Sequence, residues 1–173
     1  MRRLLTSMAL ITAVLFTDSA AFSQTPDAAA ATAAKEMTIY GTALGDGWQN
    51  WSWAKAELSV ELGGSARKPI KVTAGAWQAL YLHHEPFSTA GFAKLSLLIQ
   101  GSAPDGEVRL FAIADGKVIG EGYLLKISNT GWKQVEQPLA TLGAEDKVID
   151  GIWVQNASAV DLPKFYVTEI KLQ

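Results

Sequence analysis

The chain has 173 residues, six of them tryptophan and none cysteine, and its formal net charge is −2 at pH 7. This length fits a single domain, alone or with a short tail. The absence of cysteine excludes disulfide scaffolds, thiolate metal sites, cysteine nucleophiles and a bacterial lipoprotein anchor. With 15 basic and 17 acidic residues the chain lacks a broad cationic surface, so we expect no nucleic-acid partner.

Residues 1–23 have the pattern of a secretory signal peptide. Arg2 and Arg3 supply the charged start, an apolar core follows over 4–16, and small residues precede a cleavage site after Ser23. The apolar core is shorter than the roughly 20 residues that a membrane span needs. We therefore expect a secreted or periplasmic protein with no membrane partner. The alanine-rich segment 24–36 is expected to be a flexible leader.

From residue 37 onward polar and apolar residues alternate with a period of two, which is typical of β-strands. The expected strands span residues 37–40, 55–62, 71–73, 78–84, 94–100, 107–114, 117–127, 133–139, 149–156 and 165–172. Asp115-Gly116 is a two-residue hairpin signal between two of them. Because no amphipathic helical pattern interrupts these strands, we predict an all-β domain over residues 37–173, a two-sheet antiparallel β-sandwich.

Alternation also predicts which side chains leave the core. The regular apolar positions, expected to face inward, are Leu80, Leu82, Leu95, Leu97, Ile99, Val108, Leu110, Ile152 and Val154. The outward set between them is Tyr81, His83, Leu98, Gln100, Arg109, Phe111, Trp153 and Gln155. If these strands share a sheet, its outer surface combines aromatic rings with amide and guanidinium donors. A sheet face that only meets solvent normally carries Lys, Glu and Thr instead.

The densest aromatic segment is residues 47–53 (GWQNWSW). Three indole rings within six positions cannot all enter one core. We expect Trp53 to pack inside, and Trp48 and Trp51 to be partly exposed near a sheet edge. The alternative is that all three close one end of the sandwich as a structural corner.

A surface of this composition suits a sugar. The C–H face of a sugar ring stacks on the negative face of an aromatic ring, and amide, guanidinium and imidazole groups can bond its hydroxyls. The candidate carbohydrate-binding residues are Trp48, Trp51, Tyr81, His83, Gln100, Arg109, Trp153 and Gln155.

The aromatic motifs carry a family resemblance. They are Ile39-Tyr40 with Ala43-Leu44, the run 47–53, Ala76-Trp77, residues 79–84 (ALYLHH) and residues 165–170 (FYVTEI). In this order, over almost all of 37–173, the chain resembles bacterial carbohydrate-binding modules with a galactose-binding-like jelly-roll fold, of the kind attached to endoglucanases.

The resemblance implies a non-catalytic module that binds polysaccharide or oligosaccharide, β-glucan or a similar polymer. Such modules often place Asp after the first-strand Tyr and paired Asp in the last strand, where they suit a structural calcium. Here these positions read Gly41-Thr42 and Thr168-Glu169, so carboxylate ligands are missing. No catalytic domain shares this chain, so we expect the module to act either alone or with a separate protein, a glycoside hydrolase or an envelope protein.

Little in the sequence indicates an enzyme. His83 and His84 are adjacent, so in a strand they point to opposite faces and cannot share one metal without a bulge. No G-x-S-x-G motif occurs, and no spacing pairs two carboxylates for glycoside hydrolysis. We therefore predict no catalytic residue, no metal ligand and no cofactor. The alternatives left open are an envelope or extracellular protein-interaction domain on the same sandwich, and a hydrolase or lyase with an unrecognised site.

Overall fold

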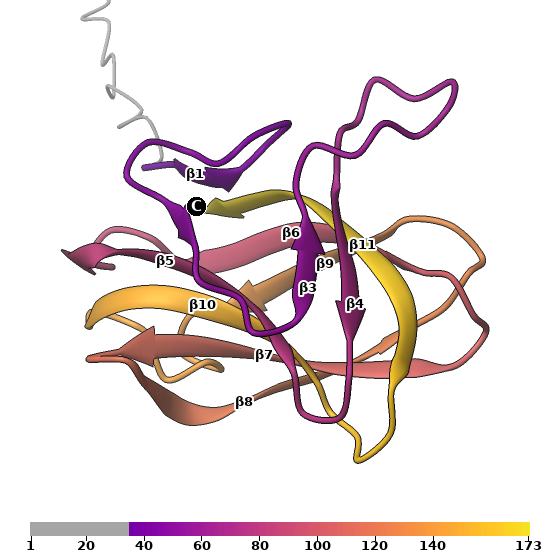
Figure 1. Cartoon of the computed structure of the whole chain (residues 1–173). Coiled ribbons are helices and arrows are strands. Elements are labelled where there is room, and N and C mark those ends of the chain that lie inside the picture. The colour runs from indigo at the N-terminus through magenta and orange to yellow at the C-terminus, as the bar shows by residue number, and fades with distance from the viewer. Residues whose placement is uncertain (1–34) are drawn as a thin grey trace, which may run out of the picture. The chain divides into compact units, whose positions relative to one another are not determined.

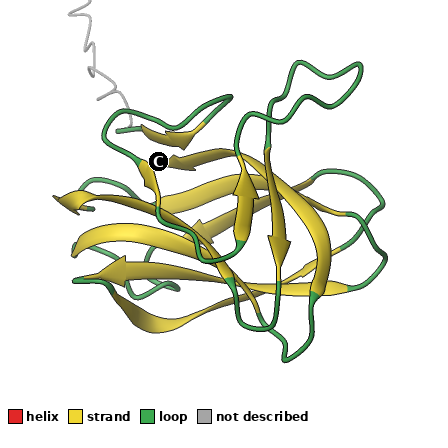
Figure 2. Cartoon of the chain, in the orientation of Figure 1, coloured by secondary structure: helices red, strands yellow, loops and turns green. Residues whose placement is uncertain are grey.

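The computed structural model describes residues 35–173. The predicted signal peptide, 1–23, and the leader up to residue 34 lie outside the described residues. The last two leader residues are described and contact the domain: Lys35 Nζ donates to the carbonyl of Ala90 at 2.8 Å, and Glu36 accepts from Lys171 at 2.8 Å. The described part contains strands and loops, and no helix that could span a membrane (Figure 2).

The strands form two antiparallel sheets that pack face to face (Figure 1), which confirms the predicted sandwich. Sheet A contains β1 (Met37–Tyr40), β3 (Lys55–Glu57), β4 (Ile70–Ala74), β6 (Lys94–Gly101), β9 (Lys133–Pro138) and β11 (Leu162–Leu172). Its order is β3-β4-β11-β6-β9, and β1 pairs with β11. Sheet B contains, in spatial order, β2 (Gln49–Asn50), β5 (Ala79–Ser88), β10 (Val148–Asn156), β7 (Gly106–Ala114) and β8 (Lys117–Ile127).

Most predicted strands lie within one or two residues of the observed ones, and the Asp115-Gly116 hairpin turn is confirmed. Both turn residues have positive φ, 52° and 65°, as a two-residue hairpin turn of this twist requires. The prediction was wrong over 55–62, where β3 ends at Glu57. There Ser59 takes φ 54° and its amide and hydroxyl bond Tyr40 Oη and the Thr42 carbonyl, which turns the chain away from the strand. The strand predicted over 78–84 was also too short, since β5 continues to Ser88.

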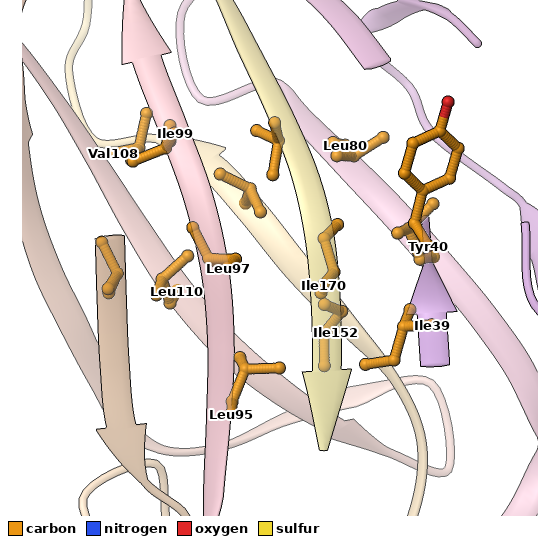
Figure 3. Close-up of a cluster of buried hydrophobic side chains, with 14 of the residues drawn as sticks. Ile39, Tyr40, Leu80, Leu95, Leu97, Ile99, Val108, Leu110, Ile152 and Ile170 are labelled. Atoms are coloured by element: carbon orange, nitrogen blue, oxygen red, sulfur yellow. The ribbon is translucent and has the colours of Figure 1, made fainter. Parts of the chain in front are cut away.

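The core lies between the sheets (Figure 3) and follows the predicted alternation. All nine residues predicted to face inward, from Leu80 to Val154, are buried. Both sheets contribute to it, and burial of this apolar area is the main term that stabilises the domain, since no disulfide exists. With the inward positions occupied in this way, the intervening side chains of each sheet must lie on its outer face.

Candidate functional site

The outer face of sheet B holds six of the eight candidate residues. Trp51 follows β2, and the other five come from three adjacent strands: Tyr81 and His83 from β5, Trp153 and Gln155 from β10, and Arg109 from β7. Cross-strand register places Trp153 opposite Tyr81 on one side and opposite Phe111 on the other. Gln155 lies opposite Arg109 in the next row.

Trp51 is one of the most exposed large side chains on this face, with 54% of its surface accessible. Its indole lies parallel to the His83 imidazole, with ring centroids 3.6 Å apart and an interplanar angle of 5°. The indole Nε1 donates to Gln49 Oε1 at 2.8 Å, and the Trp51 amide donates to the Tyr81 carbonyl at 2.9 Å. These bonds hold the ring with one face stacked on His83. The partial exposure predicted for Trp51 is confirmed.

Trp53 also lies on this outer side, so its predicted burial was wrong: 42% of its surface is exposed. The ring stands edge-on to Trp153 at 4.7 Å, with an interplanar angle of 82°. The physical reason is that β2 ends at Asn50, and residues 51–54 then run along β5 outside the regular ladder. Trp51 and Trp53 have the same parity in this extended segment, so both reach the outer side, and the prediction that placed one of them inside separated two residues that share a face.

Trp77, which the sequence left unassigned, completes a set of three exposed indoles. It is 54% exposed and has φ 59°, an uncommon backbone conformation for a bulky residue. Its carbonyl accepts two hydrogen bonds, from Trp53 Nε1 at 3.3 Å and from Gln155 Nε2 at 2.9 Å. The carbonyl of Trp77 therefore holds both the Trp53 indole and the side-chain amide of Gln155 in place. We name Trp51, Trp53 and Trp77 the indole row.

Tyr81 and His83 lie beneath this row and are nearly buried. Burial raises the pKa of the Tyr81 phenol to about 12, and the negative charge of nearby Asp150 adds to the shift. His83 is covered by Trp51, and its buried Nδ1 has no protein partner. Both residues support the exposed rings from below.

Arg109 and Gln155 supply the polar groups beside the rings. Among residues 35–173, no carboxylate lies within 4.0 Å of the Arg109 guanidinium, whose Nη1 has only the Glu121 carbonyl at 3.5 Å. Gln155 uses its amide nitrogen on Trp77 and keeps its oxygen available as an acceptor. Hydrogen-bonding groups thus lie next to exposed aromatic faces.

Two candidate residues are not in this site. Trp48, predicted to be partly exposed, is only 5% exposed and packs in the core against His84 and Phe87, with ring centroids 5.2 and 5.9 Å away. The preceding Gly47 has φ 77°, and the turn it makes directs the indole inward. Gln100 does face outward, but from sheet A, where it lies opposite Tyr166 on β11. Alternation predicts inward or outward and contains no information about which sheet a strand joins.

The positions suited to a structural calcium in the resembled modules do not fit this ion. Thr168 Oγ1 donates to the Gly41 carbonyl at 3.0 Å, and the one carboxylate there, Glu169, pairs with Arg67 Nε at 2.8 Å. A calcium ion prefers six to eight oxygen ligands and net negative charge. An arginine already neutralises this site, and within residues 35–173 no cluster of three or more His, Asp or Glu side chains could hold a metal.

Comparison with known proteins gives a consistent fold. Neither a protein-family model nor a curated protein sequence matches the chain. Solved structures do match: a family 29 carbohydrate-binding module has a TM-score of 0.59, with 15% identity over 80% of this chain and 87% of its own. A CBM29-2 variant in complex with cellulohexaose has a TM-score of 0.60, with 16% identity over 80% and 89% of the two chains. A variant in complex with mannohexaose has a TM-score of 0.56, with 15% identity over 80% and 90%. The chain has the β-sandwich fold of the family 29 carbohydrate-binding modules.

Proposed function

We propose that this protein is a non-catalytic polysaccharide-binding module whose binding site is the indole row. The observation that carries the proposal is the arrangement of exposed indoles beside β5. Trp51 covers His83, and Trp53 lies against Trp153 opposite Tyr81. The backbone carbonyl of Trp77, whose side chain is also exposed, accepts from Gln155 opposite Ala79. The matching positions on β5, residues 83 to 79, span about 13 Å at the usual rise of a strand.

This geometry favours an extended ligand with repeating apolar faces. Large indoles exposed in a contiguous group normally mark an interaction surface, because they leave apolar area in water. A polysaccharide presents a C–H face at successive rings, and each such face can stack on an indole. The Arg109 guanidinium and the Gln155 amide oxygen can then bond hydroxyl groups at the side of the chain.

The structural neighbours indicate which ligands to test first. Two of them were solved with cellulohexaose and mannohexaose. We propose a β-linked glucan or mannan as the class of ligand, since both offer regularly repeated ring faces to a linear aromatic surface.

The test is binding of cellulohexaose and mannohexaose, measured by titration calorimetry, to the mature domain and to Trp51→Ala and Trp53→Ala. We expect each substitution to weaken binding at least about tenfold, because it removes one stacking ring. Gln100→Ala is the matched control, since this residue faces outward from the other sheet. Wild-type affinity in both tryptophan variants would refute the indole row as the site.

A glycan array with the wild-type protein decides between a carbohydrate ligand and a protein partner. No binding to any glycan, together with a stoichiometric protein partner in a pull-down, would favour the alternative of a protein-interaction domain that uses the same exposed rings.

We further propose that the protein is exported. Support comes from the charged start at Arg2 and Arg3 and the apolar core over 4–16. N-terminal sequencing of the native protein should find Gln24 as the first residue. A mature chain that begins at Met1 would contradict the proposal.

A further inference from the structure

Tyr81 lies at the centre of the aromatic assembly without being part of its exposed surface. Only 8% of the residue is accessible, yet its ring stands edge-on to three others. The centroid distances are 6.1 Å to Trp51, 5.7 Å to His83 and 5.7 Å to Trp153, with interplanar angles of 85°, 89° and 77°. Its orientation therefore constrains Trp51 and Trp153 together.

The backbone of Tyr81 fixes the same neighbours. Its carbonyl accepts from the Trp51 amide at 2.9 Å, and its amide donates to Ser52 Oγ at 2.9 Å. On the β10 side, the ring lies against Gly151, where a Cβ would come within 2.5 Å of Tyr81 Cε2. No other residue type would leave room at position 151 for the ring in this place.

The free end of the ring meets a buried carboxylate. Tyr81 Oη donates to Asp150 Oδ1 at 3.4 Å, and the Gly116 amide, in the β7–β8 hairpin turn, donates to Asp150 Oδ2 at 2.8 Å. Asp150 is 6% exposed, and within residues 35–173 no Lys, Arg or His nitrogen lies within 4.0 Å of its carboxylate. Burying an unpaired carboxylate costs free energy unless donors compensate it. The phenol and the turn amide are those donors.

The phenol remains a donor under ordinary conditions. Its pKa is raised to about 12, chiefly by burial and further by the Asp150 charge, so it is protonated at neutral pH.

We infer that Tyr81 and Asp150 form a positioning pair, which sets the orientation of Trp51 and Trp153 and thereby the shape of the surface that meets the polysaccharide. This inference rests on the proposed function and changes the role of Tyr81, which the sequence indicated as a ligand contact. Through Gly116, the pair also links the indole row to the hairpin turn at the opposite edge of sheet B.

The test is a double-mutant cycle with Tyr81→Phe and Asp150→Asn, read out by oligosaccharide affinity and by near-ultraviolet circular dichroism. Tyr81→Phe keeps the ring and removes the hydrogen bond, and we expect an affinity loss of about fivefold with a changed aromatic spectrum. The double variant should lose about the same fivefold, and not the roughly 25-fold of independent effects, because both changes break one interaction. Tyr166→Phe, on the outer face of sheet A, is the matched control and should change neither measurement.

The outcomes separate the inference from the proposed function. Wild-type affinity and spectrum in Tyr81→Phe, or multiplicative losses in the cycle, would overturn the positioning pair. If the wild-type domain binds no glycan, the proposed function fails. In that case the spectra of Tyr81→Phe and Tyr166→Phe still decide whether Tyr81 orients the rings.

Discussion

The two outer faces of the sandwich are built on the same strand alternation but carry different chemistry. On sheet A, charged side chains pair with each other: Lys94 with Glu136 at 2.8 Å, and Lys71 with Glu57 at 3.0 Å. The hydrogen bond from Lys94 lowers the pKa of Glu136 below its ordinary value. On sheet B, aromatic rings contact each other, and the indole nitrogens of Trp51 and Trp53 donate to the Gln49 amide oxygen and to the Trp77 carbonyl.

The difference predicts how each face responds to substitution. Solvent-exposed ion pairs are individually weak and tolerant of change, because water already solvates both charges. Rings fixed by edge contacts and buried hydrogen bonds depend on one another, so one substitution should disturb several of them. We therefore expect sheet B to be sensitive to single changes and sheet A to be tolerant.

The largest expected effect concerns Asn156, which holds the loop that carries Trp77. This fully buried amide donates to the carbonyls of Gly75 and Val160 at 2.9 and 2.7 Å, and its oxygen accepts from Ser158. Asn156→Ala leaves these groups unpaired, so we expect a loss of about 2–4 kcal/mol in the free energy of unfolding. Urea denaturation measures it, and a loss below about 1 kcal/mol would contradict the assigned role.

A second prediction compares two glycines of β8 and its turn. Gly122 and Gly116 have nearly equal φ, 67° and 65°, but a Cβ at Gly122 would clash with the Phe111 ring and lie 2.7 Å from the Leu110 carbonyl oxygen, while one at Gly116 meets nothing within 4 Å. Gly116→Ala should cost about 1 kcal/mol through the left-handed backbone alone. Gly122→Ala should cost about 1–2 kcal/mol more, because Phe111 must shift. Equal losses in thermal unfolding would show that Phe111 is not packed on Gly122.

The third prediction concerns pH. Below pH 10, the ordinary pKa of a phenol, Tyr81 is neutral in both the folded and unfolded states. As the pH rises from 10 towards 12, the unfolded phenol ionises while the folded one stays protonated, so the folded state loses stability, by about 1 kcal/mol near pH 11. Tyr81→Phe removes this contribution, and its stability relative to wild type should rise over that range. The same substitution at Tyr166 is the control, and parallel curves for wild type and Tyr81→Phe would contradict the buried phenol.

The smallest effect is expected on sheet A. The Arg67–Glu169 pair is about half exposed on both sides, so Arg67→Ala should lower the free energy of unfolding by less than about 1 kcal/mol. Because Arg67 already neutralises the Glu169 carboxylate, neither calcium nor a chelator should shift the melting temperature of the wild-type protein. A rise in melting temperature with calcium would show that the ion displaces this pair.

Much of the fold could be predicted from local pattern. The alternation in 94–100 placed Leu95, Leu97 and Ile99 in the core, and Asp115-Gly116 specified its hairpin turn, because both depend on neighbouring residues only. The pattern failed where the backbone leaves regular geometry. Trp48 follows a positive-φ glycine, which turns its indole inward. Trp53 keeps the parity of Trp51 and shares its outer side, but this segment follows a two-residue strand that the alternation of polar and apolar residues did not reveal.

The sequence by itself determined an all-β sandwich without disulfides and the outward direction of Tyr81, Trp153 and Arg109 from their strands, since these follow from periodicity along single strands. Tertiary structure alone decided that Gln100 belongs to the other sheet and that Trp77 joins Trp51 and Trp53. Those facts depend on which strands pair and on hydrogen bonds between residues far apart in the chain, such as that from Gln155 to the Trp77 carbonyl. The high tryptophan content, six residues, was the first unusual feature of the composition. Strand pairing then brought Trp51 and Trp53 to one exposed face, and loop hydrogen bonds tied the backbone of the exposed Trp77 to Trp53 and Gln155.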